Sequence, residues 1–171
     1  MTINNSTSPT KKYKTVISAV HAIYRLVNST FELRDLVPRL VRLTCQIFNS
    51  EYCLITMLDA TKEYSLLKCI VSGKKKYIID KRTKISNRIE KKIIKKLSAI
   101  RQDNLLAVPL VCEDIAGIIM IKRDKKDAHF DKFDQEMLMT IGEQAVIGIK
   151  TLQLYEEQQR IVLGSIKSLV T

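Results

Sequence analysis

The chain has 171 residues, 46% of them hydrophobic, which is enough to bury the core of one domain with terminal extensions. Its formal net charge of +11 would suit nucleic acid, an anionic membrane or an acidic protein as partner. The lysines are scattered, however, and rarely have aromatic neighbours on which bases could stack. We therefore interpret the charge as a solvated basic surface, with a nucleic-acid-associated regulator as the alternative.

The composition also argues against a secreted or membrane-spanning protein. The first ten residues are polar and lack the apolar stretch of a signal peptide, and the apolar run at 115–121 is too short to span a bilayer. No CxxC pair occurs, and each cysteine stands in an apolar run: Cys45, Cys53, Cys69 and Cys112. We expect reduced thiols and a cytoplasmic location.

Two helices are predicted at the start of the chain, after a polar segment at 1–12 that we expect to be a disordered leader. A helical period begins at Tyr13. Pro38 must lie in the first turn of the second helix or kink it. The apolar stripes of the two helices are Val16, Val20, Ile23 and Val27, then Leu36, Leu40, Leu43 and Ile47.

The apolar period then changes to two, which is typical of strands. Asn87 and Glu90 have the spacing of a capping box, so a helix begins between the strands. Its buried face contains Ile89, Ile93, Ile94 and Leu97. The expected strands are 52–59, 65–72, an edge strand at 77–80, and a central hairpin of 105–112 and 115–122.

The last helix begins near Asp131, a plausible N-cap, and carries an apolar seam with spacings of three and four. About 38 residues make a helix of roughly 57 Å, whereas a compact domain of this size has a radius of gyration of only about 15 Å. The distal part overshoots the domain, so we expect a homodimer. Its predicted interface is Val20, Ile23, Val27, Ile141, Ala145, Gly148, Leu152, Tyr155 and Val162.

Together these elements predict an α+β fold with a central antiparallel sheet flanked by helices. Long N- and C-terminal helices would form the dimer bundle. The expected organisation is a leader at 1–12, a domain at 13–156 and a signalling helix at 157–171.

The final hairpin and helix resemble the GAF family. The matching stretches are 106–110 (Leu-Ala-Val-Pro-Leu), 115–117 (Ile-Ala-Gly), Phe130 with Asp134, 137–145 and 154–155. The resemblance covers about residues 30–156 and implies a sensory module that passes ligand or partner state to an output domain. Residues 159–171 resemble the lead-in helix of HD-GYP phosphodiesterases, which implies such an enzyme as the output, with a histidine kinase or another output domain as the alternative.

The resemblance leaves the ligand unidentified. Gln135 stands where cyclic-nucleotide-binding relatives carry Glu, and no cysteine precedes a histidine as in bilin-binding relatives. We expect no cofactor, no metal site and no catalytic residue in this chain. GAF architecture places a small-molecule pocket over the sheet, with walls drawn from Thr56, Leu58, Cys69, Ile70, Ile79, Ile93 and Met120.

An enzymatic alternative rests on the cysteines. GAF-fold thiol reductases of free methionine sulfoxide exist, and Cys53, Cys69 and Cys112 lie on neighbouring predicted strands. They would have to meet in the pocket for such chemistry. Buried cysteines of low reactivity are the interpretation that we favour.

Overall fold

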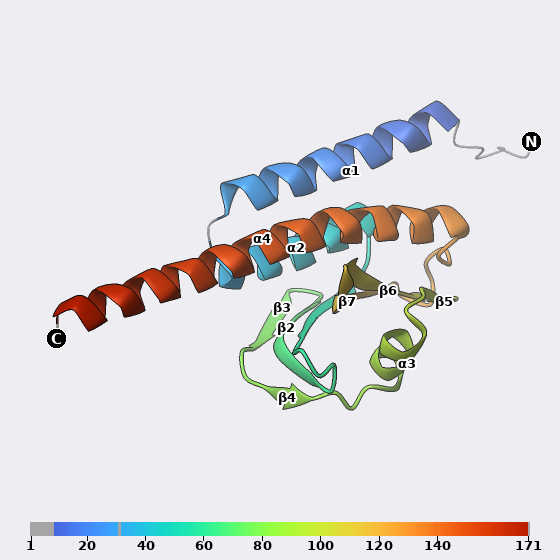
Figure 1. Cartoon of the computed structure of the whole chain (residues 1–171). Helices are drawn as coiled ribbons and strands as arrows, with labels where there is room; N and C mark the ends of the chain where they lie inside the picture. The colour runs from blue at the N-terminus through green and yellow to red at the C-terminus, as the bar shows by residue number, and fades with distance from the viewer. Residues whose placement is uncertain (1–8, 31, 171) are drawn as a thin grey trace, which may run out of the picture.

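The computed structural model describes residues 9–30 and 32–170, in which two helices are followed by four strands, a short helix, three strands and a long last helix (Figure 1). The helices are α1 (Pro9–Ser29), α2 (Leu33–Phe48), α3 (Arg88–Lys96) and α4 (Lys132–Val170). The strands are β1 (Tyr52–Leu58), β2 (Tyr64–Ser72), β3 (Lys75–Ile79), β4 (Thr83–Lys84), β5 (Ile100–Gln102), β6 (Leu105–Cys112) and β7 (Asp114–Lys122). The predicted α+β class is confirmed, and the short strands β4 and β5 are additions to it.

The first helix starts earlier than its apolar period indicated. Residues 9–12, which the sequence assigned to a disordered leader, belong to α1, so that boundary is wrong. Pro9 opens the helix because a proline in the first turn removes no hydrogen bond that the helix would otherwise make. Residues 1–8 of the predicted leader lie outside the described residues.

The second helix is held at its start by the last one. Pro38 is the sixth residue of α2, beyond the first turn, and the helix continues past it to Phe48. The N–H of Leu33, at the N-terminus of α2, donates to Oε1 of Glu156 on α4 at 3.1 Å. A carboxylate at this end complements the helix dipole, so the contact ties α4 to α2.

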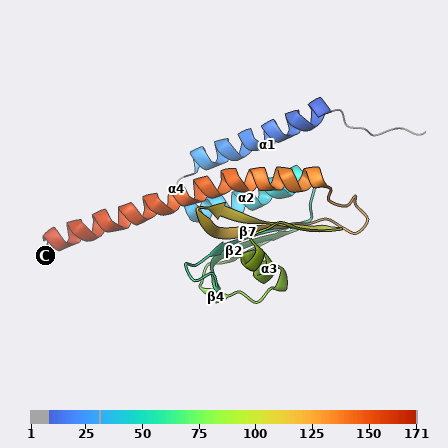
Figure 2. The same ribbon diagram turned by 45° about the vertical axis from the view of Figure 1, so that its right-hand side comes forward.

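The helices are divided unequally between the two faces of the sheet. On one face α2 packs against β1 and β2, α4 packs against β6, and α1 lies outside them in contact with both (Figures 1 and 2). The short helix α3 covers the other face, against β6 and β7. The layers are therefore α1, then α2 with α4, then the sheet, then α3.

The sheet order is β3-β2-β1-β7-β6-β5, with β4 paired to β2, and neighbouring strands are antiparallel. The hairpin of β6 and β7 lies inside the sheet, as its continuous apolar pattern predicted. The edge strand β3 also lies where it was predicted, with its bounds shifted by two residues at the start and one at the end.

Alternation along the strands divides the core into two layers. On β1, Cys53, Ile55 and Met57 enter the large core beneath the helices. Leu54 and Leu58 point the other way, into a smaller apolar layer beneath α3. Both faces of the central strands are covered, which explains the near-continuous apolar runs in the sequence.

The first half of α4 is part of the core. A Cβ on Gly142 would touch Leu110 of β6 at 3.2 Å, and a Cβ on Gly148 would collide with Val27 of α1. Six residues assigned to the dimer interface are therefore used inside the chain, so that part of the prediction is wrong. They are Ile23, Val27, Ile141, Ala145, Gly148 and Leu152.

The physical reason is that a spacing of three and four identifies an apolar helix face but not the surface that covers it. Here the covering surface is the sheet and α1 of the same chain. Within 9–30 and 32–170, none of the helices combines the length and the hydrophobicity that a bilayer crossing requires.

The close approach of α1 and α4 gives the first testable prediction. In Gly148→Ala the added Cβ would lie 2.6 Å from Cγ2 of Val27, so we expect the free energy of unfolding to fall by about 1–3 kcal/mol. The measurement is urea denaturation followed by circular dichroism.

Gly164→Ala is the matched control, because nothing lies within 4 Å of the added Cβ there. Because alanine favours a helix more than glycine does, this change should leave the free energy of unfolding unchanged or raise it by up to about 1 kcal/mol. Adding Val27→Ala to Gly148→Ala should remove the clash. Equal stability of Gly148→Ala and Gly164→Ala would show that α1 and α4 do not pack at Gly148.

Candidate functional site

The α3 face of the sheet is where the predicted ligand pocket falls. Leu58, Ile70, Ile93 and Met120 all belong to the apolar layer beneath α3. Ile79, on the edge strand, is paired with Lys68 and is half-buried. Cys69 is the exception: it points into the core beneath α2 and α4, so its place in the pocket prediction is wrong. Its neighbours Lys68 and Ile70 face the other way because strand side chains alternate.

A buried polar cluster, Thr56–Lys68–Glu90, lies in the middle of this face. Thr56 on β1 and Lys68 on β2 are directly opposite each other in the sheet register. The Thr56 hydroxyl donates to Glu90 Oε1 at 2.5 Å, and Lys68 Nζ lies 2.9 Å from Glu90 Oε2. Glu90 is fully buried, and the side chain of Lys68 is 14% exposed. The carboxylate thus binds the sheet through both oxygens.

The start of α3 fixes the position of Glu90. Asn87 is the N-cap, as predicted, and its side chain accepts hydrogen bonds from the backbone N–H groups of Ile89 and Glu90. The Glu90 side chain does not reach back to complete a capping box, because it points into the sheet. The pKa of Tyr52 is raised, first by burial and second by the charge of the nearby Glu90 carboxylate.

The sequence contained a signal for this arrangement. Glu90 stands three residues before Ile93 and four before Ile94, so it falls on the apolar stripe of its helix. A carboxylate on a buried stripe requires a partner. The structure supplies Lys68, which lies on the predicted strand 65–72. Leu97, which was predicted to be buried, ends the helix in a left-handed conformation and is exposed instead.

The α3 face is filled rather than hollow. None of the seven predicted pocket residues lines any of five well-formed hollows in the described part of the chain. One hollow of about 220 Å³ lies at the rim of α3, where the side chains of Ile85 and Ile94 are surrounded by charge. Its other lining residues are Lys62, Glu63, Lys84, Lys91 and Lys95.

A charged clamp closes one end of the α3 face. The Asp59 carboxylate accepts hydrogen bonds from Thr61 and Arg82, and the Arg82 guanidinium stacks 3.6 Å from the centre of the Tyr64 ring. Burial raises the pKa of Asp59, but the hydrogen bonds from Thr61, Arg82 and the Tyr64 N–H outweigh it and leave that pKa below its usual value. The clamp holds the segment after β3 against the β1–β2 turn.

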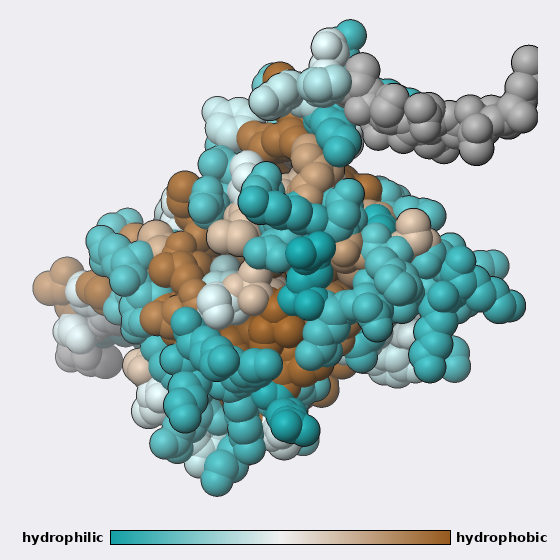
Figure 3. All heavy atoms as spheres, turned by 90° about the vertical axis from the view of Figure 1, so that its right-hand side faces the viewer, coloured by the Kyte–Doolittle hydropathy of each residue, from teal (hydrophilic) through white to brown (hydrophobic). Residues whose placement is uncertain are grey.

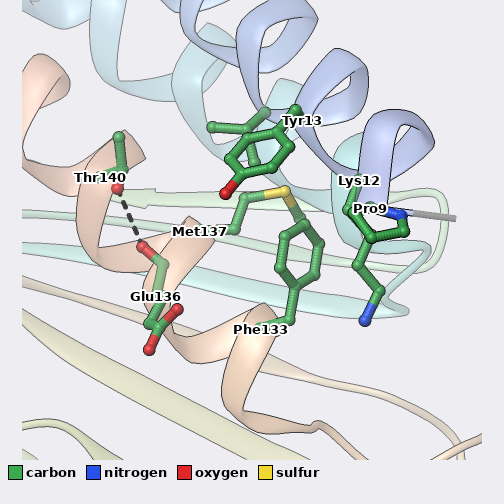
Figure 4. A pocket seen from close by; sticks show the side chains of 8 residues that line it. Pro9, Lys12, Tyr13, Phe133, Glu136, Met137 and Thr140 are labelled. Carbon is green, nitrogen blue, oxygen red and sulfur yellow. Dashed lines mark hydrogen bonds between the residues drawn. The ribbon is translucent and has the colours of Figure 1, made fainter.

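A second hollow, of about 400 Å³, lies between the first turns of α1 and α4 (Figure 4). Val16 and Met137 form its apolar part, Tyr13 and Phe133 are aromatic, and Lys12 Nζ lies 5.1 Å from the Phe133 ring centre. The space-filling view of this end shows apolar surface open between hydrophilic side chains (Figure 3). Pro9, Glu136 and Thr140 complete the lining.

The distal part of α4 is the most exposed apolar region of the described chain. From Glu157 to Val170 every residue is exposed, and the helix projects past the sheet and past the end of α1 (Figures 1 and 2). Tyr155 and Val162, assigned to the dimer interface by sequence, are 52% and 55% exposed. The apolar residues of this stem are Leu154, Tyr155, Ile161, Val162, Leu163, Ile166, Leu169 and Val170.

The three cysteines of the enzymatic alternative do not converge. Cys53 and Cys69 are buried in the core beneath α2, on the face away from α3. Cys112 ends β6 at the opposite end of the sheet, since it pairs with Asp114 whereas Cys53 pairs with Ile121. Among the described residues, no group of three or more His, Cys, Asp or Glu gathers in a way that could hold a metal ion.

No model of a protein family matches the sequence, and no curated protein sequence matches it. Several solved structures, however, are similar to it in fold. The GAF domain of a phosphoenolpyruvate-protein phosphotransferase from Coxiella burnetii is 14% identical with a TM-score of 0.68, over 84% of this chain and 98% of that one. The GAF domain of the Acinetobacter phosphoenolpyruvate-protein phosphotransferase is 15% identical with a TM-score of 0.64, over 81% and 94%.

Free methionine-R-sulfoxide reductase from Neisseria meningitidis, an enzyme, is also similar. It is 9% identical with a TM-score of 0.64, over 82% of this chain and 91% of that one. Likeness at such low sequence identity shows a shared fold and does not show a shared function. The chain therefore has the GAF fold that residues 30–156 predicted.

The buried cluster is directly testable. Lys68→Met would leave the Glu90 carboxylate buried without its cation, so we expect the free energy of unfolding to fall by about 3–5 kcal/mol. The double variant Lys68→Met with Glu90→Leu removes both charges and should recover most of that loss. Urea denaturation of the three proteins measures the coupling.

Lys132→Met is the matched control, because it breaks an ion pair with Glu136 in which the two side chains are 82% and 64% exposed. A surface pair of this kind contributes at most about 1 kcal/mol. If Lys68→Met were no more destabilising than Lys132→Met, Glu90 would not depend on Lys68 for its burial.

Proposed function

We propose that this chain is a regulatory module that dimerises through its terminal helices and relays the state of a ligand or partner to an output domain. The observation that carries the proposal is the division of α4 into two parts. Its first half is buried on β6 and α1, and its last fourteen residues, 157–170, are exposed. A helix fixed in the core at one end and free at the other is suited to carrying motion away from the sheet.

A second copy of this chain is the occupant that we propose for the stem. Tyr155, Val162, Ile166 and Leu169 continue the spacing of three and four beyond the last buried residue, Leu152. That spacing is the pattern of a two-helix seam, and charged residues do not interrupt it. Gln159, also on the seam, would set the register of the pair.

Helix α1 offers a second stripe to the same partner. Tyr13, Ile17 and Tyr24 are 71%, 57% and 64% exposed and are spaced by four and seven. Val20, which the sequence assigned to the interface, lies between them and is half-buried. The proposed dimer surface therefore combines the outward stripe of α1 with the stem of α4.

Ligand sensing is proposed for the α3 face. A ligand entering there would have to displace α3, because Glu90 and Ile93 fill the space. A physical route from this face to α4 exists. Thr56 lies on β1 beside β7, a Cβ on Gly117 of β7 would collide with the Thr56 carbonyl, and Leu110 of β6 contacts α4 at Gly142. Backbones this closely packed transmit displacement with little slack.

The output domain that we propose is an HD-GYP phosphodiesterase acting on a cyclic dinucleotide. The support is the likeness of residues 159–171 to the helix that leads into such domains. The test is to read the native gene beyond the codon for Thr171. An open frame encoding a His-Asp metal signature is expected, whereas a frame encoding another kind of domain would overturn this choice of output and leave the dimerising module in place.

The dimer itself is tested by light scattering on the whole chain. We expect twice 19.6 kDa for the unmodified protein. Val162→Glu with Ile166→Glu places carboxylates opposite carboxylates in the seam, a cost of several kcal/mol, so the dimer dissociation constant should rise about a hundredfold or more. Both side chains are exposed in the single chain, so the fold should be unchanged.

Gly164→Glu with Ser168→Glu adds the same two charges on the other side of the helix, at about 100° per residue, and is the matched control. It should remain dimeric. Leu152, which the sequence also assigned to the interface, is unsuitable for this test because its side chain is buried in the core. A monomer for the unmodified chain at high micromolar concentration, or equal dissociation of both double variants, would overturn the proposed interface.

A further inference from the structure

Two thiols meet where α2 turns into β1. Cys45 lies in the last turn of α2 and is half-buried, and Cys53 lies on β1 and is completely buried. Cys53 is the neighbour that lowers the pKa of Cys45 most. The buried Cys53 has no route to a reagent in solution, so Cys45 is the reactive member of the pair.

The same end of α2 borders a cationic hollow of about 310 Å³. The turn between β2 and β3 builds its other wall, and Gly73 makes that turn with a φ of +58°. Four of the eight residues that line it are cationic, and none of the eight is acidic. They are Arg42, Cys45, Gln46, Val71, Gly73, Lys74, Lys75 and Lys76.

The contact between the thiols prepares Cys45 for nucleophilic attack. The neighbouring Cys53 thiol lowers the pKa of Cys45 to about 7, against the opposing effect of burial. Burial raises the pKa of Cys53 well above its usual value, so that Cys53 stays protonated and remains the donor. A thiol with a pKa near the ambient pH is the best attacking group in thiol–disulfide exchange.

We propose that Cys45 is a modification site that exchanges with anionic low-molecular-weight disulfides of the glutathione class, and that the cationic hollow holds the carboxylates of the incoming group. This goes beyond the proposed regulatory function and does not depend on it. Peptide carboxylates complement Arg42 and the three lysines, and Cys45 is itself one of the residues that line the hollow.

The exchange balances without a further reagent. The Cys45 thiolate attacks one sulfur of the disulfide, a bond forms between that sulfur and Cys45 Sγ, and the original S–S bond breaks. The second half leaves as a thiolate and takes up a proton from water. Cys45 is oxidised to a mixed disulfide and one half of the reagent is reduced to a thiol.

Cys53 acts as a positioning residue in this scheme. Its S–H stabilises the thiolate of Cys45, and its own high pKa and burial prevent it from attacking the mixed disulfide. The mixed disulfide at Cys45 is therefore the product that accumulates.

The test compares three disulfides of different charge on the whole reduced chain. Oxidised glutathione is anionic, hydroxyethyl disulfide is neutral and cystamine is cationic, and peptide mapping by mass spectrometry locates each adduct. We expect oxidised glutathione to react fastest, at Cys45, and to lose its advantage at high salt. Cys45→Ser should abolish the fast adduct, while Cys69→Ser and Cys112→Ser should leave it unchanged.

Charge reversal separates the hollow from the net charge of the protein. Lys74→Glu, Lys75→Glu and Lys76→Glu together should slow oxidised glutathione roughly tenfold or more at low salt and speed cystamine. Lys91→Glu, Lys92→Glu and Lys96→Glu make the same change in net charge on the exposed face of α3 and are the matched control. Equal rates for the two triple variants, or fastest modification at another cysteine, would overturn the proposal.

The donor role of Cys53 has its own measurement, the pH dependence of the rate at Cys45. The charged and titratable groups around the two thiols are Cys69 on β2, Arg42 on the helix of Cys45, and Lys74, Lys75 and Lys76 across the hollow. Cys53→Ala removes the donor and should move the midpoint of the pH–rate profile upward, while Cys53→Ser keeps a donor and should restore it. An unchanged midpoint in Cys53→Ala would show that Cys53 has only a packing role.

Discussion

The packing of the first half of α4 between β6 and α1 is the contact on which the rest of the molecule depends. Gly142 and Gly148 let the helix approach Leu110 on one side and Val27 on the other. Glu156 then fastens the helix to the start of α2. These contacts fix the direction in which the exposed stem beyond Glu156 leaves the core.

The α3 face contributes a different kind of constraint. A buried ion pair carries a desolvation cost that apolar residues of the same volume would avoid. The main contribution of the Thr56–Lys68–Glu90 cluster is therefore to define one position for α3 rather than to raise the free energy of unfolding. The cluster ties the short helix α3, which packs against β6 and β7, to the neighbouring strands β1 and β2 as well. The same cluster occupies the space in which a ligand would lie, which makes movement of α3 a condition of sensing on this face.

The errors of the sequence interpretation have one cause in common. Ile141 and Ala145 fit a dimer seam, yet they are covered by the chain's own sheet and helices. Glu90 fits a capping box, yet its carboxylate binds Thr56 and Lys68. Cys69 was placed in the pocket although its strand turns it to the opposite face. In each case a local pattern identified the residue as structured and left its partner undetermined, because partners come from segments distant in the chain.

The order of helices and strands, the central position of the β6–β7 hairpin and the length of α4 follow from periodicities of two and 3.6 residues, which the backbone geometry imposes locally. The resemblance of residues 30–156 to GAF domains rests instead on residue motifs such as those at 106–110 and 115–117, and the fold bears it out. The sheet register, the filling of the α3 face, the division of α4 into a buried half and an exposed stem, and the meeting of Cys45 with Cys53 beside three lysines belong to the tertiary structure. Each of these features depends on contacts between segments that are distant in the sequence, and the spacing of residues within one segment carries no information about such contacts.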